Sequence, residues 1–233
     1  YLGFPMALSI PIATIFGALI CTVLLLPCLR LRGVYFAIAT LMYPLIFMRL
    51  IEALDIFGGT DGIVGVASWS NPWGERYLVI VILLLFLFAV RRLAIEDYGL
   101  LMLGVKDNDQ AVRASGINII SVKAVAVFIA SLMGCFAGAY LAHIYMWAGL
   151  SQFSLDFSII PIAATVVGGG GTLVGPVLGA FILVPISEAL REFGTLRIVF
   201  YSLILVVFIM YKSEGIMVYA ERKYHQFQHW VKV

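Results

Sequence analysis

The chain has 233 residues, of which 63% are hydrophobic and only 12% charged, with a net charge of +2. A soluble domain is about 45–50% apolar and about 25% charged, so an ordinary water-facing surface is excluded. A disordered chain and a small disulfide scaffold are excluded too, and the small net charge gives no basis for a nucleic-acid partner. The composition therefore predicts a polytopic, all-α membrane protein.

The chain begins at Tyr1 and enters an apolar stretch almost at once. No charged segment precedes an apolar core, as it would in a signal peptide. We therefore expect the sequence to be a fragment of a longer permease-like chain.

Five stretches are apolar enough to cross about 30 Å of hydrocarbon, the third being short unless Leu93–Ile95 extend it. They are Pro5–Leu29, Gly33–Ile51, Tyr77–Val90, Val122–His143 and Leu196–Tyr211. We take 1–212 as the transmembrane permease domain.

A sixth apolar region, Phe157–Val184, is interrupted by four consecutive glycines, Gly168–Gly171. Each glycine inside a helix costs about 1 kcal/mol relative to alanine, so the region cannot be one ordinary helix. The sequence predicts two segments, Ser158–Val167 and Pro176–Ser187, because proline suits the first position of a restarting helix. These are either two short spans or a re-entrant pair.

The basic residues predict the orientation, since lysine and arginine favour the cytoplasmic side. Most of them lie on one side of the membrane, in every second connection between spans and in the C-terminal tail: Arg30, Arg32, Arg91, Arg92, Lys106, Arg113, Lys123, Lys212, Arg222, Lys223 and Lys232. This side is expected to be cytoplasmic, and it includes the C-terminus. The amphipathic tail 213–233 then lies on the cytoplasmic surface.

The chain offers little for metal, cofactor or enzyme chemistry. The span interiors contain almost no ionisable residues, whereas ion-coupled transporters usually need them. The three cysteines have no metal-ligand spacing. His225 and His229 could form a metal pair, but a polar tail face is the simpler interpretation. The glycines of Gly58–Gly62 and Gly168–Thr172 lack the following lysine of a phosphate-binding loop, so this chain is not expected to hydrolyse ATP.

Small residues recur every fourth position in two places, a pattern typical of close helix packing in membranes. The first stripe lies in the fourth span and includes Ala130, Gly134 and Gly138. The second follows the glycine break and includes Gly175 and Gly179. Lining of a transport pathway is the alternative interpretation.

The connection 104–118 reads as a short cytoplasmic helix with signals at both ends. Asp107 is the expected N-cap, with Gln110 reaching back to it, and Gly116 suits the left-handed position after the helix. About eight helical residues are too few to be stable alone, so the helix must dock. It docks either on its own membrane domain and lipid headgroups or on a partner protein.

Several motifs together resemble the LivM-type permeases of bacterial ABC importers for branched-chain amino acids. Their order and spacing agree from about residue 10 to residue 217. They are Leu29–Leu41, Gly59–Ile63, Asn108–Asn118 and Gly168–Ala180. The sequence departs from the family at Met42–Leu45, at Lys106 and after Lys212, which bears on the solute more than on the fold.

The resemblance implies an inner-membrane permease that works with a homologous second permease of LivH type, two cytoplasmic ABC ATPases and an extracytoplasmic solute-binding protein. ATP and magnesium would bind to the ATPases, and the missing N-terminal part would supply further spans. The solute would be a branched-chain or other amino acid, or urea or a short amide. The segment that would seat in an ATPase comprises Asp107, Asn108, Gln110, Ala111, Val112, Arg113, Ala114, Ser115 and Gly116.

A secondary transporter, which also uses broken helices, is the competing function. An intramembrane enzyme would need a cluster of catalytic side chains, and the sequence shows none. The candidate pathway or hinge residues are Thr40, Tyr43, Thr165, Gly168, Gly169, Gly170 and Gly171. The alternative for each threonine is a hydrogen bond to its own helix.

Overall fold

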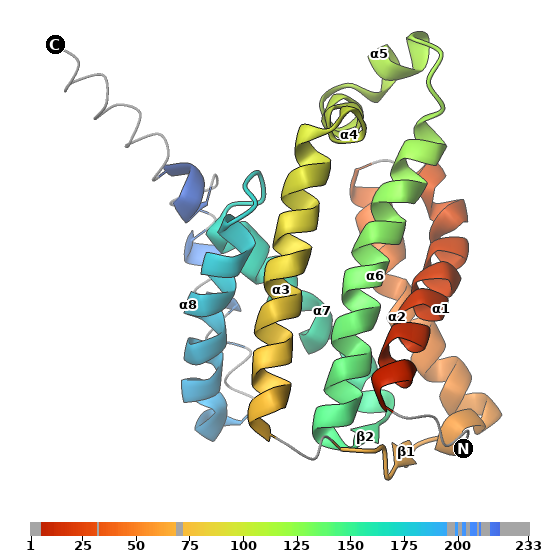
Figure 1. Cartoon of the computed structure of the whole chain (residues 1–233), viewed down its shortest axis with the longest axis vertical. Coiled ribbons are helices and arrows are strands. Elements are labelled where there is room, and N and C mark those ends of the chain that lie inside the picture. The colour runs from red at the N-terminus through yellow and green to blue at the C-terminus, as the bar shows by residue number, and fades with distance from the viewer. Residues whose placement is uncertain are drawn as a thin grey trace, which may run out of the picture. The chain divides into compact units, whose positions relative to one another are not determined.

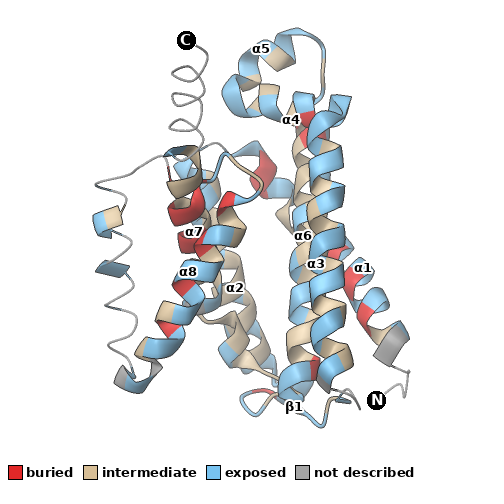
Figure 2. Ribbon diagram, turned by 60° about the vertical axis from the view of Figure 1, so that its left-hand side comes forward, coloured by how far each residue is buried: buried red, intermediate tan, exposed pale blue. Residues whose placement is uncertain are grey.

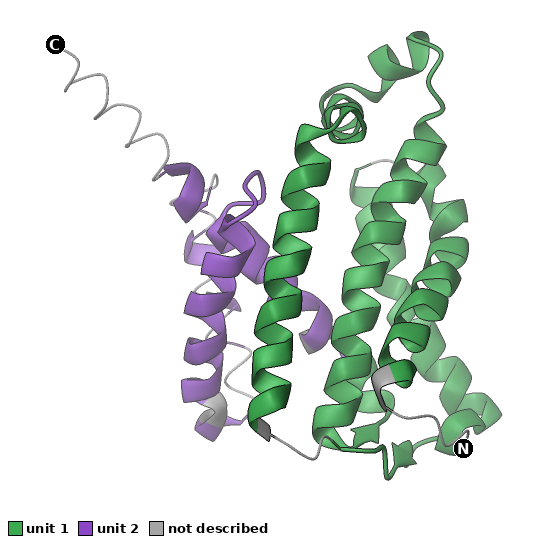
Figure 3. Cartoon of the chain, viewed as in Figure 1, with its two compact units in different colours: residues 1–153 green, residues 154–233 purple. Residues whose placement is uncertain are grey.

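The computed structural model describes residues 6–31, 33–68 and 72–194, with short pieces at 199, 202–203, 206–208, 210 and 215–219. The chain forms two compact units, residues 1–153 and 154–233 (Figure 3). Most residues of the predicted span Leu196–Tyr211 and of the predicted tail 213–233 lie outside the described residues.

Four long helices build unit 1. They are α1 (Met6–Leu25), α2 (Val34–Leu54), α3 (Pro72–Ile95) and α6 (Ile119–Tyr145), and α1 packs along α6 (Figure 1). Most of their large apolar side chains are exposed rather than buried (Figure 2). A lipid environment makes such exposure favourable, whereas water would not.

Five helical stretches among the described residues are long and apolar enough to cross a membrane. They are Leu8–Arg30, Val34–Leu54, Trp73–Ile95, Ile119–Tyr145 and Leu150–Gly168. The protein is therefore an all-α multi-pass membrane protein. The first four correspond to the first four predicted spans, with the third extended to Ile95 as expected.

At one end of unit 1, α1 tightens into the 3₁₀ helix η1 (Leu26–Arg30) before the chain turns into α2. Pro27 lies in the first turn of η1, and α2 follows Gly33, whose φ of 55° suits glycine.

The same end carries two further helices, α4 (Asp97–Asp107) and α5 (Asp109–Ala114), with α4 running across the direction of α3 (Figure 1). The sequence analysis did not foresee α4. The turn between α3 and α4 requires a glycine, because a Cβ on Gly99 would lie 2.6 Å from the Cα of Ala94.

The opposite end of unit 1 is closed by a two-stranded ribbon. Strand β1 (Ile63–Val64) follows the 3₁₀ helix η2 (Ile56–Gly58), and it pairs antiparallel with β2 (Trp147–Ala148) after α6. The indole Nε1 of Trp147 donates to the carbonyl of Asp61 at 3.0 Å, and the buried His143 ring bonds the carbonyl of Ala67 at 2.7 Å. The ribbon therefore joins the α2–α3 connection to the end of α6. A further 3₁₀ helix, η3 (Leu150–Phe153), completes the unit.

Unit 2 contains α7 (Leu155–Gly168), α8 (Gly175–Ala189) and the 3₁₀ helix η4 (Leu190–Phe193). Its core is a small cluster in which α7 packs against α8: Ala163, Ala164, Val167 and Leu183. Helix α8 alone, with 15 residues, spans about 22 Å, which is less than the hydrocarbon thickness.

Candidate functional site

The N-cap of α5 is Asn108, not Asp107 as the sequence predicted. The Asn108 Oδ1 accepts hydrogen bonds from the backbone N–H groups of Gln110 and Ala111, each at 3.1 Å. Asp107 is unavailable for this role because it is the last residue of α4, and the chain leaves helical geometry only at Asn108 (φ −153°, ψ 96°). A sequence prediction that included α4, with its end at Asp107, would have placed the N-cap of α5 at Asn108.

The end of α5 resembles the predicted one. Gly116 has a φ of 80°, in the left-handed region, and its N–H donates to the carbonyl of Arg113 at 3.0 Å. The hydroxyl of Ser115 donates to the carbonyl of Ala111 at 3.2 Å. Six residues are helical, fewer than the eight expected.

One side of helix α5 packs against α4. A Cβ on Gly104 of α4 would lie 3.3 Å from the Cγ2 of Val112, so the half-buried Val112 faces α4. Gln110, Ala111, Arg113 and Ala114 are exposed. They form the face of α5 that remains for another molecule.

The glycine region divides into a tightly packed half and an open half. A Cβ on Gly168 would overlap the carbonyl of Gly175, and Gly169 has a φ of 115° that other residues rarely adopt. Gly170 and Gly171 are exposed, and a Cβ on Gly171 would meet nothing within 4 Å. Only Gly168 and Gly169 therefore need to be glycine for structural reasons.

Thr172 organises the connection between α7 and α8, a role that the sequence analysis missed. Its hydroxyl donates to the carbonyl of Gly169 at 3.1 Å and accepts from the N–H of Gly175 at 3.1 Å. A threonine three residues before a Gly-Pro helix start was the available signal.

The two predicted packing stripes differ. A Cβ on Gly179 would overlap the carbonyl oxygen of Ala164 and lie 3.0 Å from the nitrogen of Gly168. A Cβ on Gly175 would lie 2.9 Å from the carbonyl oxygen of Gly168. These glycines let α8 approach the backbone of α7.

The stripe on α6 makes no such approach. Ala130, Gly134 and Gly138 are exposed, and a Cβ on either glycine would meet no described atom within 4 Å. The face of α6 that packs against α1 is a different one, where a Cβ on Gly17 would lie 2.9 Å from the Sγ of Cys135. The expected packing of the α6 stripe is therefore not made within the described chain.

The three candidate pathway hydroxyls all donate to backbone carbonyls. Thr40 bonds the carbonyls of Phe36 and Ala37 at 3.0 Å, and Thr165 bonds that of Pro161 at 2.8 Å. Both threonines thus follow the alternative of bonding their own helix. Tyr43 instead reaches another helix and donates to the carbonyl of Leu24 at 2.9 Å. Thr40 and Tyr43 belong to unit 1, and Thr165 belongs to unit 2.

Among the described residues, no group of three or more histidine, cysteine, aspartate or glutamate side chains could hold a metal ion. The possible pair His225 and His229 lies outside those residues.

Residues 1–211 match the family model described as "Branched-chain amino acid transport system / permease component". The match covers unit 1 and most of unit 2, including α4, α5 and the glycine break.

The relatives include two bacterial proteins and one archaeal protein. The chain is 25% identical to the high-affinity branched-chain amino acid transport system permease protein LivM of Escherichia coli, over 93% of this chain and 58% of the relative. The corresponding protein of Salmonella typhimurium is 24% identical over the same shares. A probable LivM protein of Methanocaldococcus jannaschii is 21% identical, over 90% of this chain and 67% of the relative. The chain thus spans little more than half the length of the two bacterial relatives, and no solved structure matches it.

Proposed function

The chain belongs to the family of branched-chain amino acid transport permeases, and from this we propose that it is the membrane-spanning subunit of an ATP-driven importer for small apolar amino acids. The match over residues 1–211 is the observation that carries the proposal. The multi-pass helical fold supports it, since five helical stretches can cross a membrane.

The proposed complex contains a second, homologous permease, two ATPases that bind ATP and magnesium, and an extracytoplasmic solute-binding protein. In the proposed orientation, the end of unit 1 that carries α4 and α5 lies in the cytoplasm. The C-terminus lies on the same side. The excess of basic residues in these connections supports this orientation.

The exposed face of α5 is the proposed contact with an ATPase. Arg113 on this face can bind a carboxylate or backbone carbonyls through its planar guanidinium group. Ala111 and Ala114 leave room for close approach of the partner. Helix α5 is capped at Asn108 and packs on α4 through Val112. Because of these two contacts, a displacement of α5 by the ATPase would move α4 as well.

Charge reversal at Arg113 tests this contact. We expect Arg113→Glu to release the ATPase from the purified complex, or to lower the amount of solute transported per ATP hydrolysed. Arg91→Glu is the matched control, since Arg91 is also exposed but lies on α3. If both variants keep their ATPases in detergent and their transport per ATP in proteoliposomes, the basic side chains serve lipid headgroups and the contact is wrongly assigned.

Uptake of labelled leucine tests the transport class. Import that needs ATP and persists when a protonophore collapses the proton gradient supports the proposal. Import that stops with the proton gradient would identify a secondary transporter instead.

A further inference from the structure

A short piece of chain beyond the last predicted span lies directly on the glycine break between α7 and α8. Gly215 is buried and has a φ of 86°. A Cβ on Gly215 would lie 2.6 Å from the backbone nitrogen of Gly169 and 3.1 Å from the carbonyl carbon of Gly168. The backbones of three glycines from distant parts of the sequence therefore meet at one point. Figure 1 shows the piece 215–219, in dark blue, beside the ends of α7 and α8 that the break joins.

Side chains extend this contact. Residues 216–219 form a single helical turn, in which the N–H of Tyr219 donates to the carbonyl of Gly215 at 3.3 Å. Ile216 on this turn packs against the apolar cluster of unit 2, and so does Phe208 from the last predicted span. The end of that span and the segment 215–219 thus both lie on the pair of helices α7 and α8.

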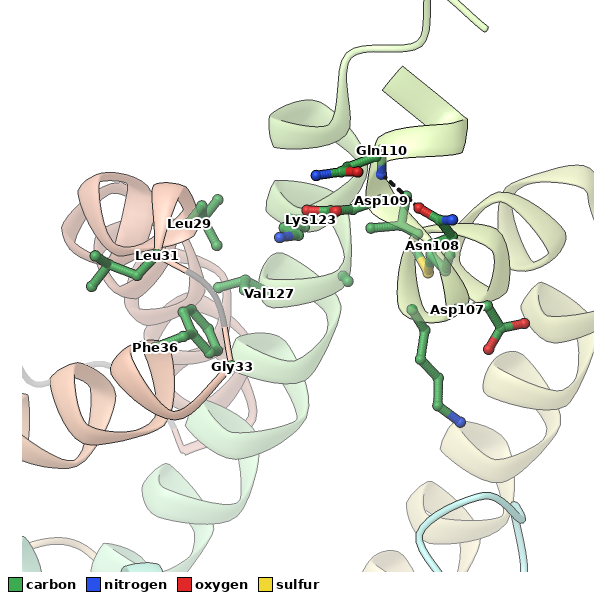
Figure 4. Close-up of a pocket in the computed structure, with 14 residues that line it drawn as sticks. Leu29, Leu31, Gly33, Phe36, Asp107, Asn108, Asp109, Gln110, Lys123 and Val127 are labelled. Carbon is green, nitrogen blue, oxygen red and sulfur yellow. Dashed lines mark hydrogen bonds between the residues drawn. The ribbon is translucent and has the colours of Figure 1, made fainter. Parts of the chain in front are cut away.

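The pair of helices has no spare room inside. The cavity between them has a volume of about 10 Å³, at the lower limit of what one water molecule needs, and is lined by Ile160, Ala163, Leu183 and Ser187. Unit 1, by contrast, holds an open cavity of about 720 Å³ beside α5 (Figure 4). Closely packed elements change between discrete arrangements rather than by gradual deformation. Helices α7 and α8 therefore cannot rearrange at the break while the segment 215–219 stays on it.

The segment itself is held by little buried area. Of its five residues only Gly215 is buried, whereas residues 216–218 are half-buried and Tyr219 is exposed. Elements with few buried apolar contacts open at low free-energy cost, and moving parts of proteins are drawn from them. The segment fits the break closely but can leave it without unfolding α7 or α8.

The contact also indicates the depth of the glycine break in the membrane. Lys212, at the end of the last predicted span, comes three residues before Gly215 in the sequence. Lysines at the ends of spans stay at the membrane surface. Because Gly215 touches Gly168 and Gly169, the break lies near that same surface, on the side of the C-terminal tail, and not at the middle of the membrane.

We propose that residues 215–219 are a latch on the glycine break, and that the latch is released in each transport cycle so that α7 and α8 can move. The release rests on the proposed function, since ATP would drive it. In the proposed orientation the latch and the tail that follows it lie on the side where the ATPases bind. A change in the ATPases that favours the released state would shift the latch toward it.

Seating of the latch is tested with the assembled complex in lipid nanodiscs, without ATP. Val167→Cys places a reporter thiol in the cluster under the latch, where Val167 is 3% exposed. Gly171→Cys places one in the exposed part of the break. A membrane-impermeant maleimide should label the first at least about tenfold more slowly than the second, with each site read by mass spectrometry so that the native cysteines do not interfere. Equal rates would overturn the proposal.

Two variants that loosen the latch should raise labelling of Val167→Cys by about fivefold or more. Ile216→Ala removes the apolar contact with the cluster, and Met217→Ala is its control, because half-buried Met217 is not among the described residues that pack on that cluster. Gly215→Ala adds a Cβ that overlaps the break. Its control is Gly194→Ala, where φ is also positive, at 56°, but nothing lies within 4 Å. If both variants label like their controls, the segment does not cover the break and the proposal is overturned.

Hydrogen exchange across residues 168–175 gives the same comparison without a reporter thiol, should Val167→Cys assemble poorly. Ile216→Ala should speed exchange there, and Met217→Ala should not. The depth of the break is tested in vesicles of known orientation. Gly171→Cys should react with the maleimide only from the side of the C-terminal tail, and Thr60→Cys, in the connection before β1, only from the other side. Labelling of both thiols from one side would contradict the assigned depth and overturn the proposal.

Release is tested by adding ATP and the leucine-loaded binding protein, a response that a merely structural contact would not give. In the complex with no loosening variant, labelling of Val167→Cys should rise by about fivefold or more during turnover. With Ile216→Ala it should already be high and change little. If ATP-dependent leucine import proceeds and labelling does not change, the contact is fixed, and the latch is overturned while the proposed function stands. Absence of ATP-dependent import would refute the proposed function and the release with it, whereas the seating measured without ATP would be unaffected.

Discussion

The hydroxyl of Tyr43 on α2 donates a hydrogen bond to the backbone carbonyl of Leu24, near the end of α1, at 2.9 Å. The chain changes from α-helix to 3₁₀ helix just after this point. In 3₁₀ geometry the carbonyl of residue 24 would accept from the N–H of residue 27, but residue 27 is proline and has none. Tyr43 therefore supplies the hydrogen bond that Pro27 removes, and it joins α2 to α1.

Removal of the Tyr43 hydroxyl should destabilise this junction. We expect Tyr43→Phe to lower the free energy of unfolding by about 1–3 kcal/mol, because a partly buried carbonyl loses its partner. Tyr35→Phe is the control, since Tyr35 lies on the same helix and is 75% exposed. Thermal unfolding of the purified complex in detergent measures the difference, and equal midpoints for the two variants would contradict the assignment.

Alanine substitutions should separate the packed glycines of unit 2 from the open one. Gly179→Ala would force α7 and α8 apart, because the new Cβ would overlap the carbonyl of Ala164. We expect poor assembly and lost transport. Gly171→Ala adds the same methyl group where nothing lies within 4 Å, and it should assemble and transport normally. Membrane levels and uptake measured side by side check both outcomes.

The contact between α1 and α6 should respond to paired changes in size. A Cβ on Gly17 would lie 2.9 Å from the Sγ of Cys135, so Gly17→Ala should lower stability. Cys135→Ala removes that sulfur atom, and the double variant should recover most of the loss. A double-mutant cycle on thermal stability measures the coupling. Additive effects would show that the two residues do not meet.

Two neighbouring substitutions distinguish the true cap of α5 from the predicted one. Asn108→Ala removes the acceptor for two backbone N–H groups and should destabilise α5 by about 1 kcal/mol. Transport per ATP should fall while the ATPases stay bound. Asp107→Ala should have little effect, because a carboxylate in the last turn of α4 is not favoured by the helix dipole. Hydrogen exchange across residues 108–116 checks the loosening directly.

The long helices could be predicted from sequence because hydrophobic length is a strong local signal. The predicted span Val122–His143 lies within α6, and Gly33–Ile51 nearly coincides with α2. Helix α7 ends at Gly168 and helix α8 begins at Gly175. Which of the four consecutive glycines is packed could not be predicted, because that depends on where the other helix lies.

The elements that escaped prediction have weak or ambiguous patterns in the sequence. Helix α4 has a mixed surface and begins at a turn that only the glycine at Gly99 permits. The ribbon pairs Ile63 with Ala148, and two-residue strands have no periodicity to detect. The stripe of Gly134 and Gly138 has the spacing of a packed face, yet spacing alone cannot tell which molecule covers that face.

The ribbon of β1 and β2 fixes one end of unit 1 and so determines where movement is largest. Trp147 and His143 tie the end of α6 to the α2–α3 connection, which makes this end a pivot. Helix α6 has 27 residues and is about 40 Å long, so a tilt of about 5° about that pivot displaces its other end by about 3–4 Å. Any tilt of α6 about the ribbon would therefore change the helix arrangement at the α5 end more than at the ribbon end.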